Sequence, residues 1–142
     1  LIVRERGYID NATPSANGVA IANLVRLALL TRNPDYLARA ERGLQAFSGV
    51  MQRSAQACPS LFSALDWYRN GTLAQTTDEL LQATIPQYFP RTVCALETHL
   101  PEGAVGLVCQ GLTCGEPAQS EEDFLQQLRE TYDNSDRSQF IA

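Results

Sequence analysis

Long apolar runs and basic clusters are both missing from this sequence. No stretch of its 142 residues approaches the roughly 18 consecutive apolar residues needed to cross a bilayer. The most apolar segment, residues 19–30, is interrupted by Asn23 and Arg26, and it lacks the basic flank and cleavage site of a signal peptide. Lysine is absent: all eleven basic residues are arginine, against sixteen acidic residues, and the net charge is -5. We therefore expect no membrane span and, because no basic patch neutralises phosphates, no nucleic-acid binding.

Cysteine and histidine are scarce as well. Four cysteines are too few for a disulfide scaffold, which favours a reducing, cytoplasmic location. Cys58 and Cys94 stand in apolar surroundings, where free cysteines are usually buried. Cys109 and Cys114 are spaced C-x4-C, which suits neither zinc ligation nor a C-x-x-C redox centre. We interpret them as structural, with a disulfide or redox pair as the alternative. The single His99 is predicted to be exposed in a loop, and no metal or cofactor is expected.

Three helices are predicted in the first half of the chain. Ser15 suits the N-cap of a helix over 16–31, and Asn33 suits the N-cap of a helix over 34–53; a third helix covers 59–69. The first helix is apolar on nearly every side, which is typical of a helix buried all round. The second has one apolar stripe at spacings of three and four, typical of a surface helix. This alternation predicts the inner and outer rings of a helical toroid.

The second half alternates between strands and helices. Residues 72–132 are predicted to form a small β-α-β-β-α appendage, followed by a polar tail over 133–142. A capping box at Thr76 and Glu79 opens the first of its helices, with Ile85 facing inward. Apolar, β-branched runs predict its strands. The predicted strands are 72–75, 92–96 and 104–109, and the last helix begins at Ser120-Glu121-Glu122-Asp123.

The fold class predicted is mainly α with a small α/β appendage: a C-terminal fragment of an (α/α)6 toroid whose last helices occupy residues 1–71. The sequence begins without methionine, inside the strand-like run Leu1-Ile2-Val3-Arg4, so we expect a processed or truncated product. A first helix that is apolar all round needs more neighbours than this chain supplies. The expected partner is the rest of the same polypeptide, and the piece alone is expected to form homo-oligomers.

Several motifs carry a family resemblance. In order they are Leu1-Ile2-Val3-Arg4, Asp10-Asn11-Ala12-Thr13-Pro14-Ser15-x-Asn17, Ala64-Leu65-Asp66, and Val108-Cys109-x4-Cys114-x2-Pro117 with Glu121-Glu122. They resemble the end of the YyaL-type proteins, a family that includes a mammalian spermatogenesis-associated thioredoxin-like relative. The resemblance implies a thioredoxin-like domain followed by a six-hairpin-glycosidase-like barrel, similar to that of N-acylglucosamine 2-epimerases, and a role in carbohydrate metabolism. One position departs from the family's Pro-Ser-Gly-Asn: Ala16 stands in place of the glycine, and Gly18 follows Asn17.

The loop from Asp10 to Asn17 is the candidate site. Ligands of (α/α) barrels sit among the loops at the ends of inner helices. Four loop residues offer acceptors and amide donors suited to sugar hydroxyls: Asp10, Asn11, Ser15 and Asn17. The alternative is that these side chains cap the helix and shape its entry. No residue is assigned a catalytic role.

Three functions are left as hypotheses. The first is a carbohydrate-binding or sugar-epimerase-like protein with this loop on its pocket rim. Phe62, Trp67 and Tyr68 then offer a stacking surface, unless they only pack at helical spacing. The second is a non-catalytic structural or interaction domain, favoured by the displaced glycine and by the lack of a clear acid/base pair. The third is a thiol-redox accessory module, acting through Cys109 and Cys114, for an absent thioredoxin-like domain.

Overall fold

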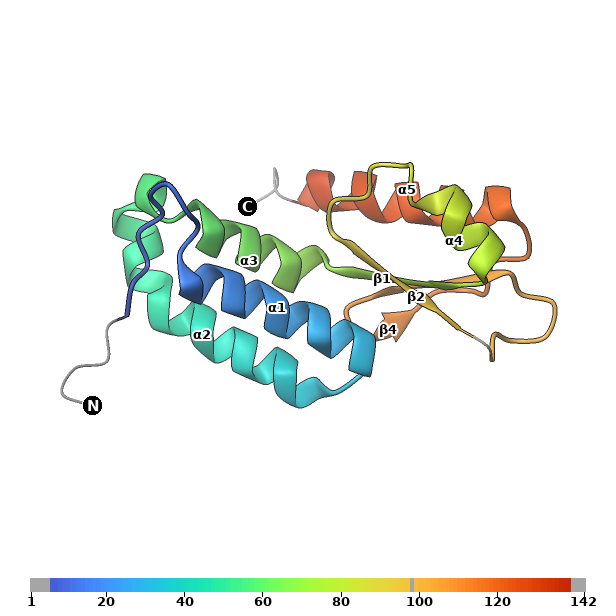
Figure 1. Ribbon diagram of the computed structural model, residues 1–142, viewed down its shortest axis with the longest axis horizontal. Coiled ribbons are helices and arrows are strands. Elements are labelled where there is room, and N and C mark those ends of the chain that lie inside the picture. Colours follow the sequence, from blue (N-terminus) through green and yellow to red (C-terminus); the bar gives the residue numbers. More distant parts are fainter. Residues whose placement is uncertain (1–5, 98, 139–142) are drawn as a thin grey trace. The chain divides into compact units, whose positions relative to one another are not determined.

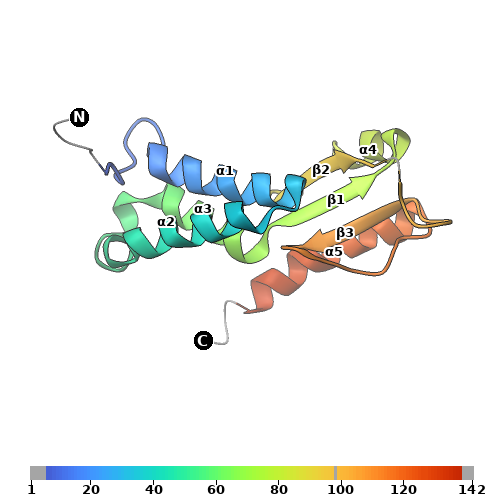
Figure 2. The ribbon, with the colours of Figure 1, turned by 90° about the horizontal axis from the view of Figure 1, so that it is seen from below.

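The computed structural model describes residues 6–97 and 99–138. The run Leu1–Arg4, which belongs to the family resemblance, lies outside these residues. The chain divides into two compact units, Leu1–Arg69 and Asn70–Ala142, which we call the first and the second unit. Figures 1 and 2 give two views of the ribbon.

In the described part of the first unit we find three α-helices and one short 3-10 helix. They are α1 (Ala16–Thr31), α2 (Pro34–Arg53), η1 (Ala55–Ala57) and α3 (Pro59–Asn70). The predicted caps are confirmed: the Ser15 hydroxyl accepts from the backbone N–H of Gly18 at 3.2 Å, and the Asn33 side chain accepts from that of Asp35 at 2.9 Å. Arg32, the C-cap of α1, has a left-handed φ of 54°. The chain therefore reverses between the two helices, and α2 runs back along α1 (Figure 1).

The helix α1 is apolar on more sides than this unit covers. It buries Ile21, Ala22, Val25, Ala28 and Leu29, and α2 buries the predicted stripe of Ala40, Leu44, Phe47 and Met51. Val19, Leu27 and Leu30, however, are 43%, 42% and 47% exposed. This confirms the expectation that the first helix needs more apolar neighbours than this chain supplies. These three side chains lie on one side of the helix by their spacing, and we call them the α1 stripe.

The start of α3 touches α1 at Gly18. This glycine is buried, and a Cβ built on it would overlap the side chain of Ser60 and lie 2.9 Å from its carbonyl carbon. Glycine is the residue that allows two backbones to approach so closely. The glycine that stands two places later than in the family motif therefore has a packing role within this unit.

The described part of the second unit is a four-stranded mixed sheet with two helices. Its elements are β1 (Thr72–Thr76), α4 (Asp78–Thr84), β2 (Thr92–Leu96), β3 (Gly106–Gln110), β4 (Thr113–Cys114) and α5 (Glu121–Ser138). The strand order is β2-β1-β3-β4. The strands β1 and β2 are parallel, whereas β3 is antiparallel to both β1 and β4. The elements follow the predicted order with one addition, the short strand β4.

Both helices of this unit pack on the same face of the sheet. One buried cluster joins residues of β1, β3, α4 and α5. Its members are Ala74, Leu80, Val108, Ala118, Phe124, Leu125 and Leu128. Because successive strand residues point to opposite faces, Leu73 and Cys109, which are paired across β1 and β3, lie on the other face.

The helix α4 does not begin as predicted. Its N-cap is Thr77, which makes no side-chain capping bond, while Thr76 ends β1 and donates its hydroxyl to the carbonyl of Val105 at 3.0 Å. The predicted capping box is therefore wrong, because Thr76 is the last residue of β1 and its hydroxyl is bonded to Val105 instead of to the start of α4. Ile85, expected to face inward, is 63% exposed, since α4 ends at Thr84.

The helix α5 begins as predicted and continues further. The hydroxyl of Ser120 accepts from the backbone N–H of Asp123 at 3.2 Å, which confirms the predicted cap. The helix extends to Ser138, so the first part of the expected polar tail, 133–138, is helical. Residues 139–142 lie outside the described part.

The predicted fold class is wrong. A fragment of an (α/α)6 toroid would consist of helical hairpins, but here α3 is followed directly by a sheet. Across residues 6–97 and 99–138 we find five α-helices and a four-stranded mixed sheet, which make a small α/β structure. The apolar character of α1 suggested an inner toroid helix, but the mixed sheet that follows α3 does not continue a ring of helical hairpins.

The contact at Gly18 gives a first prediction. Gly18→Ala should destabilise the first unit by about 1–3 kcal/mol, because the added methyl forces α1 and α3 apart. The measurement is denaturant unfolding followed by the fluorescence of Trp67, the single tryptophan, which lies in α3 and is 6% exposed.

Gly49→Ala is the matched control within α2. A Cβ there meets only the end of the flexible Arg53 side chain, at 3.2 Å. Alanine should raise stability by about 1 kcal/mol through its higher helix propensity. Equal effects at the two positions would contradict the close contact at Gly18.

Candidate functional site

Asp10 lies at the centre of the predicted site. One oxygen of its carboxylate accepts from the backbone N–H of Ser15 at 2.7 Å and from the hydroxyl of Ser60 at 2.6 Å. The other accepts from the backbone N–H of Ser60 at 2.5 Å. Asp10 therefore holds the N-cap residue of α1 and the first turn of α3 together, although 50 positions separate it from Ser60.

The two serine hydroxyls are satisfied within this cluster. Since the Ser60 hydroxyl donates to Asp10, it accepts the hydrogen of the Ser15 hydroxyl, 2.9 Å away. The Ser15 hydroxyl in turn accepts from the backbone N–H of Gly18. Each hydroxyl hydrogen thus has an acceptor in this cluster.

Asn11 and Asn17 differ in their surroundings. The side-chain amide of Asn17 donates to the carbonyl of Gly7 at 2.7 Å, and Asn17 is half-buried. Asn11 is exposed, and its backbone N–H donates to the carbonyl of Thr13 at 3.2 Å. Of the four predicted residues, Asp10 and Ser15 share one hydrogen-bonded cluster, whereas Asn11 and Asn17 are outside it.

The chemistry of the cluster is that of a helix cap. Hydrogen bonds from Ser60 come first among the causes that hold the pKa of Asp10 below its ordinary value of 3.8, and those from Ser15 act in the same direction. Desolvation opposes them without reversing the direction. A carboxylate with a lowered pKa is a poor general base at neutral pH, so this geometry stabilises structure rather than proton transfer.

Sequence reasoning missed Ser60. A signal was present: α3 begins at Pro59 and is preceded by Cys58, which is not one of the residues that usually cap helices. A helix start without a local cap needs its acceptor from elsewhere in the chain. Asp10 supplies that acceptor.

A hollow of ≈ 530 Å³ lies beside this cluster. Its polar lining residues include Asp10, Asn11, Ser63 and Arg26. Arg26 lies over the ring of Trp67, 4.3 Å from its centre, and donates to the side chain of Asn23 at 2.8 Å. Val19 and Ala22 of α1 add apolar groups to the lining.

The three aromatic residues of α3 do not form one stacking surface. Trp67 is buried beneath Arg26. Phe62, which is 39% exposed, and Tyr68 line a different hollow of ≈ 510 Å³ between α2 and α3. The packing interpretation therefore holds for Trp67.

In the second unit, Cys109 and Cys114 form a disulfide. Of the free cysteines, Cys58 is buried as predicted, whereas Cys94 is exposed and that prediction is wrong. His99 is confirmed as an exposed loop residue: its side chain is 91% exposed, and its Nδ1 lies 4.0 Å from a carboxylate oxygen of Glu97.

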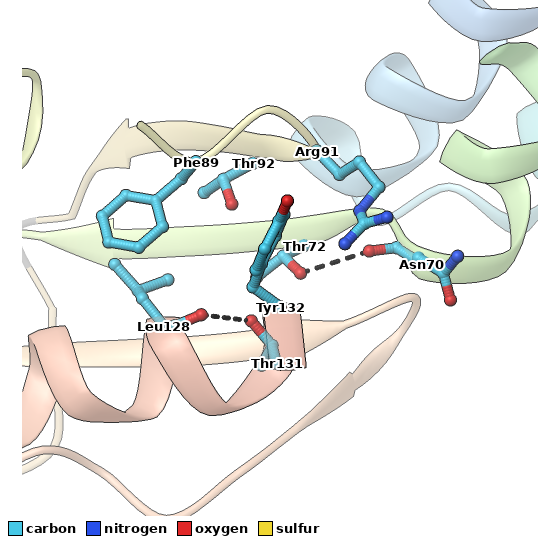
Figure 3. Close-up of a pocket in the computed structure, with 8 residues that line it drawn as sticks. All are labelled: Asn70, Thr72, Phe89, Arg91, Thr92, Leu128, Thr131 and Tyr132. Atoms are coloured by element: carbon cyan, nitrogen blue, oxygen red, sulfur yellow. Dashed lines mark hydrogen bonds between the residues drawn. The ribbon is translucent and has the colours of Figure 1, made fainter. Parts of the chain in front are cut away.

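Figure 3 shows a small hollow between the helix α5 and the sheet. The guanidinium of Arg91 lies 4.9 Å from the centre of the Tyr132 ring. Thr131 donates its hydroxyl to the carbonyl of Leu128 at 2.7 Å, and Thr72 donates to that of Asn70 at 3.4 Å. The volume of this hollow, ≈ 10 Å³, is about that of one water probe. The hollow is therefore too small for a ligand.

Metal sites and membrane spans are not found in the part of the chain that the structure describes. Within 6–97 and 99–138, no three histidine, cysteine or acidic side chains gather as metal ligands do. In the same ranges, no helix has the length and apolar character required to traverse a bilayer.

Comparison with known proteins reveals a similarity to spermatogenesis-associated protein 20 of Rattus norvegicus. The two are 36% identical over 97 residues, which covers 61% of this chain and 12% of the rat protein. The chain thus spans about an eighth of the length of that relative. No protein-family model matches the sequence, and no solved structure matches it. The glycosidase-like and thioredoxin-like features remain predictions from the resemblance.

The Asp10 cluster gives a second prediction. A pKa that is lower in the folded protein stabilises it above the ordinary value of 3.8, and this stabilisation is lost as the pH falls through the folded value. Asp10→Asn should lower the denaturation midpoint at neutral pH and weaken the dependence of that midpoint on pH in acid. Trp67 fluorescence in urea, measured from neutral to strongly acidic pH, reports both effects.

Asp35→Asn serves as the control for loss of one negative charge. Asp35 is exposed in the first turn of α2, where a carboxylate contributes only about 0.3–1 kcal/mol through the helix dipole. If the two variants lose the same stability at neutral pH, Asp10 is no more than a surface charge.

Proposed function

We propose that this chain is a non-catalytic structural and interaction segment of a protein similar to spermatogenesis-associated protein 20. The observation that carries the proposal is the mutual hydrogen bonding of Asp10, Ser15 and Ser60. These hydrogen bonds engage the polar groups of Asp10 and Ser15, which a catalytic pocket in this loop would need for its substrate. The cluster instead fixes the start of α1, and so it fixes the surface that α1 presents.

The α1 stripe is the surface that we propose for the interaction. Val19, Leu27 and Leu30 expose two-fifths or more of their area on one side of α1. Leu27 and Leu30 are neighbours on that side, and exposed apolar side chains that gather are typical of interfaces. Because the similar rat protein extends far beyond the aligned 12%, we propose further polypeptide of the same protein as the occupant. Burial of one such side chain contributes about 1.5–3 kcal/mol when complete.

Self-association of the chain by itself is the expected consequence. In isolation, the α1 stripe should pair with a second copy, and light scattering at micromolar concentration should give a mass above the 15.6 kDa of one chain. Leu27→Glu with Leu30→Glu should return the mass to that of a monomer, because a charge cannot be buried unpaired. Ile85→Glu, at a 63% exposed position of the second unit, should leave the mass of the assembly unchanged.

Cysteine labelling tests whether further polypeptide of the same protein covers the α1 stripe. In a Cys94→Ser background, which removes the exposed free thiol, a thiol introduced by Leu27→Cys should react with a maleimide in the isolated chain made monomeric by Leu30→Glu. The same thiol should be protected in the intact protein. A monomeric wild-type chain, or a thiol equally reactive in both forms, would contradict the proposed surface.

A sugar-binding role for the same loop is the second candidate. It is favoured by the hollow of ≈ 530 Å³ that Asp10 and Asn11 border. In this case monosaccharides should shift the side-chain amide resonances of Asn11 and Asn17 in a saturable manner. Asn33, whose side chain caps α2, is the reference that should not shift. Unchanged amide spectra at millimolar sugar exclude this role.

A further inference from the structure

A charged side chain stands within the α1 stripe. Arg26 follows Val19 by seven positions and precedes Leu30 by four, and residues at these spacings lie along one line of a helix surface. The side chain of Arg26 is half-buried, whereas Val19 and Leu30 are exposed. Polypeptide that covers Val19 and Leu30 therefore also covers Arg26, which lies between them.

The guanidinium of Arg26 is held in place by two neighbours. It lies over the ring of Trp67, 4.3 Å from the ring centre, and its Nη1 donates to the side-chain oxygen of Asn23 at 2.8 Å. Trp67 is itself buried, so the ring is a fixed support. A planar group that is already stacked and hydrogen-bonded loses little conformational freedom when it binds a partner.

The positive charge of this guanidinium has no carboxylate partner within residues 6–97 and 99–138. The one hydrogen bond that these residues give it goes to Asn23, which is neutral. Asp10 borders the same hollow as Arg26, but its two oxygens accept from Ser15 and Ser60. The remaining N–H donors of Arg26 are therefore available to a group that approaches from outside the unit.

Burial of the α1 stripe sets a condition on its occupant. A charge that is taken out of water without a partner strongly destabilises a complex. A second copy of α1 does not supply that partner, because this helix contains no aspartate or glutamate and presents the same arginine. The occupant must therefore bring the anion on its own surface.

From these contacts we propose that the polypeptide covering the α1 stripe carries an aspartate or glutamate set among apolar side chains, and that this carboxylate pairs with Arg26. The inference rests on the proposed function, since it names the chemistry of the segment that covers the same surface. The parallel N–H groups of a guanidinium match the two oxygens of a carboxylate, while the apolar neighbours cover Leu27 and Leu30. Self-association of the isolated chain leaves Arg26 without this partner and is therefore the weaker of the two interactions.

Two synthetic peptides test the charge of the occupant. Both are about 20 residues long, beyond the length at which isolated helices are marginal, and both lack tryptophan. Both carry leucines at spacings of three and four along one face. One peptide has a glutamate at the centre of that face, and the other has a glutamine there.

The fluorescence of Trp67 is the readout for binding. Trp67 is the single tryptophan and lies beneath Arg26, so its emission reports on the surroundings of the guanidinium. At chain concentrations too low for self-association, the glutamate peptide should bind about tenfold more tightly than the glutamine peptide, through charge-assisted hydrogen bonds. The net charge of the chain is -5 and repels the glutamate peptide at long range, so overall charge does not produce this preference.

Arg26→Gln should abolish the preference for the glutamate peptide. The matched control is Arg39→Gln, which removes the same charge from an exposed position of α2 and should keep the preference. A preference that survives Arg26→Gln would overturn the pairing with Arg26. The comparison of the two peptides on the wild-type chain needs no variant, and it decides the matter even if Arg26→Gln does not fold.

The outcomes separate this inference from the proposed function. Equal binding of the two peptides to the wild-type chain would overturn the carboxylate pairing and leave the α1 stripe as an apolar interaction surface. Binding of neither peptide would contradict the stripe as an interaction surface, and the pairing with it. Unchanged binding of both peptides to Leu27→Glu with Leu30→Glu would contradict the stripe in the same way.

Discussion

In the first unit, one carboxylate stands between the starts of two helices that are far apart in the sequence. Asp10 accepts the backbone N–H of Ser15 in front of α1, and the N–H and hydroxyl of Ser60 in the first turn of α3. The first N–H groups of a helix have no partner within it, so two helix starts this close together need a shared acceptor. The contact of Gly18 with Ser60 and the direction of the whole Asp10–Asn17 loop follow from this arrangement.

The same hydrogen bonds explain why polar loop residues are an unreliable sign of a ligand site. Asp, Asn and Ser are favoured both in pockets and in turns, since their short side chains bond to nearby backbone. The sequence alone allowed Asp10 and Ser15 either to bind a ligand in a pocket or to cap a helix. In the structure these two residues bond to helix starts, while Asn11 remains exposed beside the hollow.

Local features of this fold were predictable from the sequence, and distant ones were not. The bounds of α1 and β2 and the caps at Ser15, Asn33 and Ser120 were predicted correctly, because a cap or a β-branched run acts within a few residues. The bond between Asp10 and Ser60 spans 50 positions and has no periodic signal. The capping box at Thr76 failed for a related reason: a carbonyl distant in the sequence, that of Val105, accepts its hydroxyl hydrogen. The fold class failed because an apolar helix beside an amphipathic one was extended to a ring of helical hairpins, whereas the composition of α1 does not say which kind of element covers its apolar sides.

The overlap that a Cβ at Gly18 would make with Ser60 also limits how this protein can change during evolution. A side chain at position 18 requires the start of α3 to move away, and that movement would break the hydrogen bonds of Ser60 to Asp10. Positions 10, 18 and 60 are therefore expected to be inherited as a set. A related protein without this glycine would need a different hydrogen-bond acceptor for the first turn of α3.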